Sequence, residues 1–309
     1  MTQRPKRARR AVDGVLLLDK PVGFTSNGAL QRVKRLYGAA KAGHTGSLDP
    51  LASGLLPLCF GEATKMSGWL LDANKEYRVG CRFGARTTTG DADGDVIETL
   101  PPPAKDATAL ERALDGLRGE IDQVPPMYSA LKQGGQRLYE LARAGKEVER
   151  PARRVTIFEF EPLGWDDDTL LGLRVRCSKG TYVRTLVEDL GRALGSCAHV
   201  AWLRRTAADP YVLDARCHTL DALERLHADG GEAALDGLLL PVDSAVADWP
   251  RVDLGPDAAH YIKQGQPVMV ARAPLDRMLR LYGPGDAFLG VGAVGDDGQV
   301  APKRLIKTN

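Results

Sequence analysis

The segment KAGHTGSLDPLASG, residues 41–54, combines three glycines and a proline with no regular spacing of apolar residues. Glycine and proline at this density interrupt helices and strands, so the segment is predicted to be a loop. Loops held by a rigid scaffold are where catalytic and binding residues are commonly found. Asp49 is a candidate for such a role. The pair Asp49-Pro50 also has a simpler interpretation, because an Asp-Pro pair can merely start a turn.

Regular elements are predicted upstream of this loop. The apolar run GVLLLD (14–19) indicates a strand, and the sequence KPVG (20–23) indicates a turn after it. Ser26 is then predicted to cap a helix that ends near Gly38. Its inward residues recur at helical spacing and are Leu30, Val33 and Leu36.

Further elements are predicted downstream. KEYRVGCRF (75–83) alternates as a strand does, and Tyr77 lies on its apolar face. The aspartate-rich segment 87–95 is predicted to be a hairpin or recognition loop, because its glycine and acidic spacing do not fit a calcium loop. An amphipathic helix is predicted at 182–194, with Arg184 in its first turn. An earlier helix at 106–119 and strands at 154–160 and 170–177 are also predicted.

Composition excludes several classes of protein. The chain has 309 residues, of which 43% are hydrophobic and 27% charged, as expected for a globular protein with a sizeable core. No apolar run is long enough to span a membrane. The basic start of the chain is not followed by the apolar segment of a secretory signal, so a cytoplasmic protein is expected.

Cysteine and glycine patterns exclude other sites. The five cysteines are scattered without a C-x-x-C pair, which disfavours a disulfide framework and a structural zinc site. Residues 290–295 match G-x-G-x-x-G, but a hairpin turn follows and too few residues remain for a βαβ unit. We therefore interpret that segment as a glycine-bearing strand.

Positive charge gathers in two segments of a chain whose net charge is only +2. Residues 1–10 carry five positive charges and no acid, and residues 132–154 carry seven positive charges against three acids. Such segments suit a polyanion held along one face. They are also found on the solvated surface of ordinary proteins, and charge alone favours this second interpretation.

Residues 43–54 resemble the pattern G-H-x-G-x-L-D-P-x-A-x-G of the TruB family of pseudouridine synthases. Four further segments resemble the family in the expected order, namely LDKP (18–21), KEYR (75–78), PPMYSALK (125–132) and SKGTYVRTL (178–186). The resemblance is strong over residues 12–210 and weaker beyond them.

The resemblance implies an α/β (α+β) fold with a mixed, largely antiparallel central sheet at 12–250. A small β-rich, PUA-like RNA-binding domain is implied at 251–309. Residues 125–153 correspond to the insertion, here called the thumb, with which the family grips RNA. Residues 1–11 have no counterpart, and we expect them to form a disordered basic tail.

The activity that the resemblance implies is conversion of uridine 55 in the T-loop of transfer RNA to pseudouridine. This isomerisation detaches uracil and rejoins it through carbon, without exchanging electrons or consuming water, so no cofactor or metal is expected. A carboxylate such as Asp49 can act as nucleophile or proton acceptor and stabilise positive charge on the sugar. The expected partner is the T-arm of transfer RNA, with no membrane, no obligate protein partner and a monomeric chain. Two alternatives stay open: a synthase for another RNA site, and a transfer RNA folding chaperone.

The resemblance also assigns roles to residues outside the loop. Arg184 is implied as the partner of Asp49, keeping it ionised and oriented by paired hydrogen bonds. Tyr77 is implied as the stacking platform for a flipped base, although a core tyrosine on a strand is the simpler interpretation. The implied substrate-binding residues are His44, Tyr182 and Leu203, beside Tyr77 itself. Cations expected to bind RNA from the thumb are Lys132, Arg137, Arg143 and Lys146, here called the thumb cations. Lys20 and Lys65 are interpreted as structural or phosphate-facing.

Overall fold

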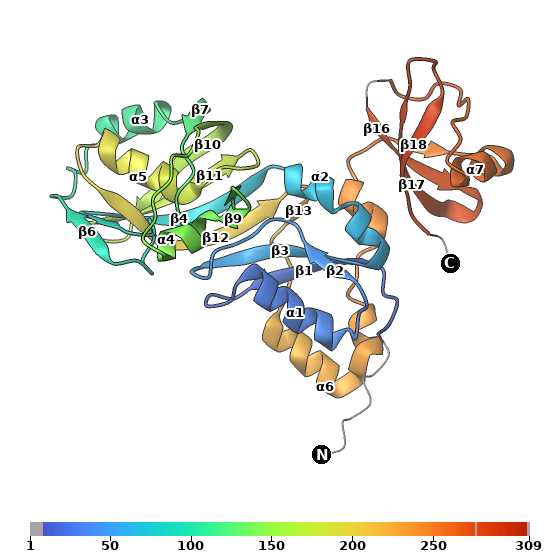
Figure 1. Ribbon diagram of the computed structural model, residues 1–309, viewed down its shortest axis with the longest axis horizontal. Helices are drawn as coiled ribbons and strands as arrows, with labels where there is room; N and C mark the ends of the chain where they lie inside the picture. Colours follow the sequence, from blue (N-terminus) through green and yellow to red (C-terminus); the bar gives the residue numbers. More distant parts are fainter. Residues whose placement is uncertain (1–8, 276, 308–309) are drawn as a thin grey trace.

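The computed structural model describes residues 9–275 and 277–307, and a ten-stranded sheet dominates it (Figure 1). Its strands, in spatial order, are β14 (His218–Thr219), β1 (Gly14–Lys20), β3 (Ala52–Phe60), β12 (Ala198–Ala208), β4 (Lys75–Phe83), β11 (Leu170–Cys177), β10 (Arg153–Trp165) and β7 (Gly119–Gln123), with β2 (Ala42–His44) beside β3 and β13 (Tyr211–Val212) beside β12. Only the pairs β1–β14 and β3–β12 are parallel. The predicted α/β (α+β) class with a mixed, largely antiparallel sheet is confirmed.

Helices cover this sheet in two groups (Figure 1). Near the N-terminal strands, α1 (Ser26–Leu36) packs against α6 (Leu220–Asp236). Over the other half, α3 (Ala107–Asp115) lies against α5 (Val183–Ala193). The remaining short elements of this part are η1 (Gly61–Lys65), α2 (Ser67–Asp72), β5 (Ala85–Thr87), β6 (Val96–Thr99) and η2 (Val242–Val246). Apolar residues from both groups and from the sheet form one continuous core.

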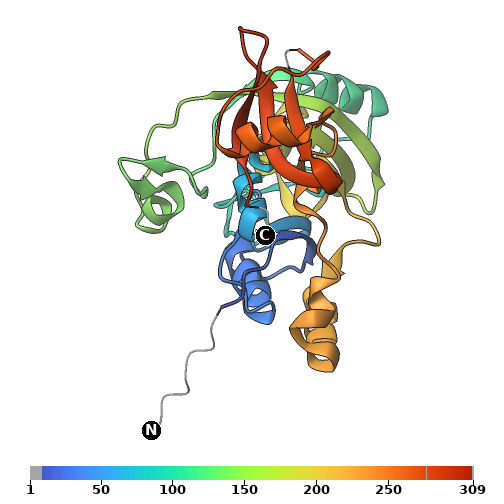
Figure 2. The ribbon, with the colours of Figure 1, turned by 90° about the vertical axis from the view of Figure 1, so that its right-hand side faces the viewer.

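The thumb stands away from the rest of the chain (Figure 2). It contains the short hairpin β8 (Lys132–Gln133) and β9 (Gln136–Arg137), followed by α4 (Leu138–Arg143).

The C-terminal residues form a separate four-stranded sheet. Its order is β15 (Arg251–Asp253), β16 (Met278–Gly283), β17 (Ala287–Val294) and β18 (Val300–Leu305), with α7 (Pro256–Lys263) and η3 (Pro284–Asp286). The glycine pattern at 290–295 lies largely on β17, as its interpretation as a strand requires. A Cβ at Gly290 would stand 2.1 Å from the carbonyl oxygen of Arg304, so close strand approach explains that glycine.

Two expectations about the first residues are corrected by the structure. Thr25, not Ser26, caps α1, because the Thr25 hydroxyl accepts a hydrogen bond from the amide of Gly28 at 3.0 Å. Arg10, assigned to the disordered tail, pairs with Ala39 through backbone hydrogen bonds. The rest of that prediction falls mainly on residues 1–8, which lie outside the described residues. In the described part of the chain, no helix is long and apolar enough to cross a membrane.

Candidate active site

Asp49 lies in the loop between β2 and β3, close to the centre of the large sheet. The loop leads into β3 at the point where β3 pairs in parallel with β12. Gly54 is required there: its φ is +100°, and a Cβ would stand 2.3 Å from the carbonyl oxygen of Arg205 on β12. Close approach of these two strands therefore fixes one end of the loop that carries Asp49.

Two side chains from outside the loop hold its backbone. The Ser26 hydroxyl accepts a hydrogen bond from the amide of Leu48 at 2.7 Å and donates to the Leu48 carbonyl at 3.2 Å. Arg205 is buried and donates from Nε to the carbonyl of Leu55 at 2.6 Å and from Nη2 to that of Gly46 at 3.4 Å. The residue next to Asp49 is thus fixed by a side chain at the start of α1, which the sequence interpretation used only as a helix cap.

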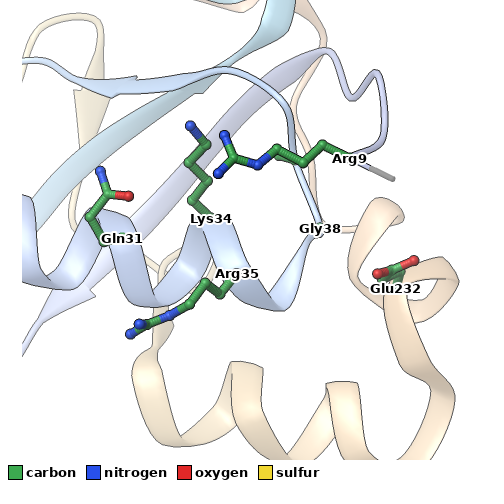
Figure 3. A pocket seen from close by; sticks show the side chains of 7 residues that line it. Arg9, Gln31, Lys34, Arg35, Gly38 and Glu232 are labelled. Carbon is green, nitrogen blue, oxygen red and sulfur yellow. The ribbon is translucent and has the colours of Figure 1, made fainter. Parts of the chain in front are cut away.

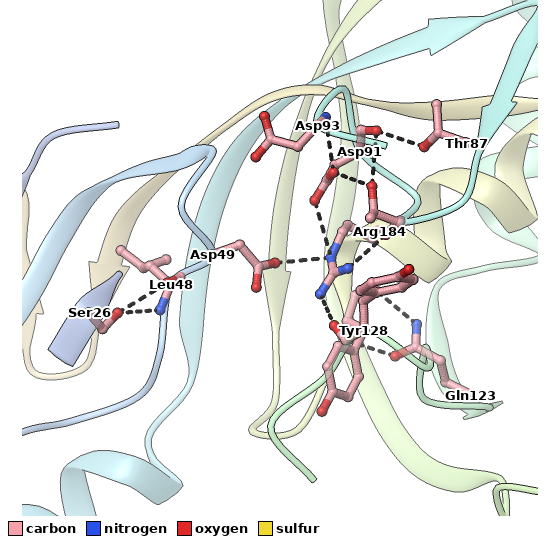
Figure 4. A network of polar contacts seen from close by, with 11 residues as sticks. Ser26, Leu48, Asp49, Thr87, Asp91, Asp93, Gln123, Tyr128 and Arg184 are labelled. Carbon is pink, nitrogen blue, oxygen red and sulfur yellow. Dashed lines mark hydrogen bonds and ion pairs between the residues drawn. The ribbon is translucent and has the colours of Figure 1, made fainter. Parts of the chain in front are cut away.

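Arg184 points from the first turn of α5 toward Asp49 (Figure 4). Its Nε lies 3.0 Å from Oδ2 of Asp49, and only 7% of the arginine side chain is exposed. Its other two nitrogens donate to backbone carbonyls, Nη1 to Thr89 at 2.7 Å and Nη2 to Tyr128 at 2.8 Å. The structure brings the two predicted partners together. The expected pair of hydrogen bonds to Asp49 is wrong, because Nη1 and Nη2 are occupied by these carbonyls.

A second carboxylate, Asp91, lies beside the same arginine (Figure 4). Its Oδ2 is 3.9 Å from Arg184 Nε, and its side chain is as buried as that of Arg184. The hydroxyl of Thr89 donates a hydrogen bond to Oδ1 of Asp91. The backbone of this turn is tied to β12 by the amide of Ala92, which donates to Val200 at 2.9 Å. The aspartate-rich turn therefore contributes a charged residue to the site, which its sequence did not indicate.

The pKa of Asp49 is raised above that of a free aspartate. Burial is the main cause, and the Asp91 carboxylate adds to it, while the Arg184 guanidinium and the Lys20 ammonium oppose the rise. The side chain still exposes 42% of its surface, so solvent and substrate can reach it. A carboxylate that is both accessible and more basic than usual suits attack on carbon or acceptance of a proton.

Lys20 and Lys65 both have structural surroundings. The Lys20 ammonium is fully buried and donates to the carbonyls of Pro21 at 2.9 Å and Phe24 at 2.7 Å. Burial lowers its pKa to about 8, and nearby Asp49 counteracts part of that change. Lys65 pairs with Glu62 at 2.6 Å and donates to the carbonyl of Leu305 on β18 at 2.9 Å. These contacts favour the structural interpretation over a phosphate-facing one.

The two predicted tyrosines lie near the ion pair. Tyr77 is half-buried on β4 and packs against the main core, and burial raises the pKa of its phenol. Asp49 is close enough to Tyr77 to contribute to that rise. Tyr182 precedes α5, where the side-chain amide of Gln123 accepts from its backbone amide at 2.7 Å and donates to its carbonyl at 3.1 Å. The core and site interpretations of Tyr77 are therefore compatible.

His44 and Leu203 have weaker links to Asp49. His44 is half-buried on β2, its pKa is lowered by burial, and its Nδ1 has no hydrogen-bond partner among the described residues. Leu203 is 8% exposed on β12, where it faces Ala52 and Val79 of the neighbouring strands. Its packing is that of a core residue.

The thumb cations are all exposed. Arg137 donates to the hydroxyl of Tyr139 at 3.2 Å, and the Arg143 guanidinium lies 5.5 Å from the centre of the same ring. Tyr128, at the base of the thumb, is the residue whose carbonyl accepts from Arg184. The thumb is thus joined to the site through its base. Within residues 9–275 and 277–307, no group of three or more His, Cys, Asp or Glu side chains is arranged to hold a metal ion.

Comparison with known proteins adds the family context. Residues 34–183 match the family described as "TruB family pseudouridylate synthase (N terminal domain)". Residues 184–247 match "tRNA pseudouridylate synthase B C-terminal domain", and residues 250–306 match "Pseudouridine synthase II TruB, C-terminal".

Similar proteins match over almost the whole chain. The chain is 57% identical over 303 residues to the protein named tRNA pseudouridine synthase B of Ectopseudomonas mendocina (strain ymp), with 98% of each chain covered. It is 54% identical over 307 residues to the protein of the same name from Pseudomonas aeruginosa (strain UCBPP-PA14), covering 98% of this chain and 99% of that one. Among solved structures, a chain of the "Cbf5-Nop10-Gar1 Complex" is 26% identical with a TM-score of 0.70, and the match covers 95% of this chain and 84% of that chain.

Proposed function

This chain belongs to the TruB family of tRNA pseudouridine synthases, and from that premise we propose that it converts uridine 55 in the T-loop to pseudouridine with Asp49 as its catalytic residue. The observation that carries the proposal is the Asp49–Arg184 ion pair. It joins an accessible carboxylate in the motif loop to a buried guanidinium on α5. Nearby aromatic side chains and the exposed thumb supply the other features that a flipped nucleotide needs.

The reaction breaks the bond between uracil N1 and ribose C1′ and forms a bond between C5 and C1′. The proton on C5 is lost and N1 gains one, so no atom is consumed. Asp49 serves as nucleophile or base in these steps, and its negative charge stabilises positive charge on the sugar. Arg184 orients the carboxylate through Oδ2, which leaves the other oxygen for the substrate. Because no electron is exchanged, we propose that the enzyme works without metal or cofactor.

Access to the uridine requires base flipping. Extruding a nucleotide from a folded loop costs about a few kcal/mol in lost stacking. Stacking on Tyr77 returns roughly 1–3 kcal/mol of that cost. Tyr182, His44 and Leu203 complete the proposed nucleotide pocket, and the backbone clamp from Gln123 holds Tyr182 in place.

RNA affinity is proposed to come mainly from outside this pocket. The thumb cations are exposed and carry no fixed acidic partner among the described residues, so they are available to phosphates. We further propose that residues 251–309 form a PUA-like RNA-binding domain. The enzyme is proposed to act as a cytoplasmic monomer without an obligate protein partner.

The site of modification is tested by incubating the purified protein with an unmodified transfer RNA transcript and mapping pseudouridine at each position. A matched transcript with cytidine at position 55 is the control. We expect pseudouridine at position 55 of the first transcript and none in the second. Modification of another uridine at comparable rate in both would assign the enzyme to a different RNA site.

A further inference from the structure

A second cluster of positive charge lies away from Asp49, where the end of α1 meets the first described residues. Its side chains line a pocket of about 210 Å³. Figure 3 shows Arg9 and Lys34 extending into the same region, with Gln31 beside them on α1. Arg35 and, across the pocket on α6, Glu232 are the other charged residues of its lining. The lining therefore carries three positive charges and one negative charge, although the Arg35 side chain is turned away from Arg9 and Lys34 in Figure 3.

Arg9 is held over this pocket by its neighbour. The amide of Arg10 donates to the carbonyl of Gly38 at 2.8 Å, and the amide of Ala40 donates to the carbonyl of Arg10 at 2.8 Å. The Arg10 guanidinium pairs with Asp236 and lies 3.6 Å from Glu232. Arg10 thus opposes the one negative charge of the pocket and fixes the backbone from which Arg9 projects.

The three cations of the pocket lack acidic partners in the described part of the chain. Ion pairs with the residues at 9–275 and 277–307 are absent for all three, namely Arg9, Lys34 and Arg35. Arg32, on the same helix, differs because Glu224 of α6 holds its guanidinium. Like charges gathered without a counter-charge attract anions to the surface they line.

The pocket lies within reach of an RNA bound at Asp49. Helix α1 begins at Ser26, whose hydroxyl holds Leu48 beside Asp49, and it ends at the pocket. Its 11 residues span about 16 Å at 1.5 Å per residue. The helix contains no acidic residue, and in Figure 2 it lies on the same side of α6 as the thumb. Helix α1 itself therefore carries only positive or neutral side chains between the catalytic loop and the pocket, and Glu224 of α6 lies against it at Arg32.

We propose that this pocket binds the phosphodiester backbone of the transfer RNA substrate, about one helix length from the flipped uridine. The inference rests on transfer RNA being the substrate, and it does not depend on which uridine is modified. Arginine and lysine suit this role because each neutralised phosphate releases condensed counterions. The sequence directly before Arg9 adds Arg4, Lys6 and Arg7, so positive charge continues along the chain.

The test replaces Arg9, Lys34 and Arg35 together by glutamine in the full chain. The dissociation constant for unmodified transfer RNA is measured against salt concentration. We expect the slope of log affinity against log salt to fall by about 2 to 3, since each duplex phosphate contact contributes roughly 0.9. At physiological salt we expect binding to weaken about tenfold or more. The single-turnover rate at saturating RNA should be unchanged, because the pocket does not touch Asp49.

Arg32→Gln is the matched control, since it removes one charge from the same helix at a residue that already has a partner. Its slope should stay within about 0.3 of wild type, because no phosphate contact is lost. A wild-type slope for the triple variant would overturn the proposal. If Arg32→Gln lowered the salt slope by as much per charge removed as the triple variant does, the effect would come from net charge, and this result would also overturn the proposal. Asp49→Asn separates this inference from the proposed chemistry: it should abolish turnover and keep the wild-type salt slope.

Discussion

Replacing Arg184 by lysine probes the link between Asp49 and its surroundings. The guanidinium makes three polar contacts with three different partners: Asp49 at 3.0 Å, Thr89 at 2.7 Å and Tyr128 at 2.8 Å. A lysine ammonium keeps the charge but cannot reach three partners spread around a planar fork. One or two of the three contacts must therefore be lost, and water cannot readily replace them because only 7% of the side chain is exposed.

The size of the effect follows from those contacts. A hydrogen bond to a charged group contributes about 1.5–3 kcal/mol. Loss of one or two such bonds, with the carboxylate no longer held in one direction, corresponds to a transition-state penalty of about 3–4 kcal/mol. Since each 1.36 kcal/mol changes a rate tenfold, the single-turnover rate of Arg184→Lys should fall by roughly 10²–10³.

The assay measures pseudouridine in transfer RNA under single-turnover conditions, with RNA binding and thermal unfolding measured in parallel. Arg192→Lys is the matched control, because Arg192 lies in the last turn of the same helix with 58% of its side chain exposed. Its rate should stay within about twofold of wild type, as expected for an exposed ion pair. A folded Arg184→Lys protein that works at the wild-type rate would refute the claim that the guanidinium orients Asp49.

Three further outcomes are expected. Neutralising the thumb cations to glutamine should weaken transfer RNA binding and flatten its salt dependence; an unchanged slope would move the main RNA contacts elsewhere. Ser26→Ala should leave the buried amide and carbonyl of Leu48 unpaired and lower the single-turnover rate by about tenfold or more with little change in RNA affinity, because an unmet buried polar group costs about 1–3 kcal/mol. Ser67→Ala, which removes a hydroxyl bonded to the carbonyl of Thr64 instead, serves as its control, and equal rates in both variants would count against the claim that the Ser26 hydroxyl holds the loop beside Asp49. Turnover should survive EDTA if the RNA stays folded, and loss of activity that divalent ions restore would contradict a metal-free mechanism.

Local patterns predicted the elements better than the contacts between them. The strand at 75–83 was predicted with the bounds that the structure has, since its alternation reports one buried face directly. The helix that carries Arg184 was placed within one residue at each end. The position of Asp49 beside Arg184 could be expected only from the family resemblance, because no local pattern joins two residues so far apart in sequence.

The contacts that the sequence did not predict share one physical cause. The Ser26 hydroxyl was assigned to a helix cap, yet it bonds to a loop residue that folding brings beside it. The sequence around Asp91 does not predict its contact with Arg184, because only the packing of the Asp91 turn on β12 brings these two side chains together. The second and third nitrogens of Arg184 go to backbone carbonyls, which carry no sequence signal at all. Contacts made by the backbone or by tertiary packing are invisible to periodicity and composition.

The central claim, that Asp49 performs the chemistry, is tested most directly by the single-turnover rate of Asp49→Asn on unmodified transfer RNA. The amide is nearly isosteric, so folding should change little, but it carries no charge and cannot act as a carboxylate nucleophile or base. Pseudouridine formation should fall by several orders of magnitude, while transfer RNA binding stays within about tenfold of wild type because phosphate and stacking contacts dominate affinity. A variant that forms pseudouridine at close to the wild-type rate would contradict the assignment. One that loses the chemistry yet fully restores cells lacking the protein would confirm the catalytic role and make RNA folding the physiological function.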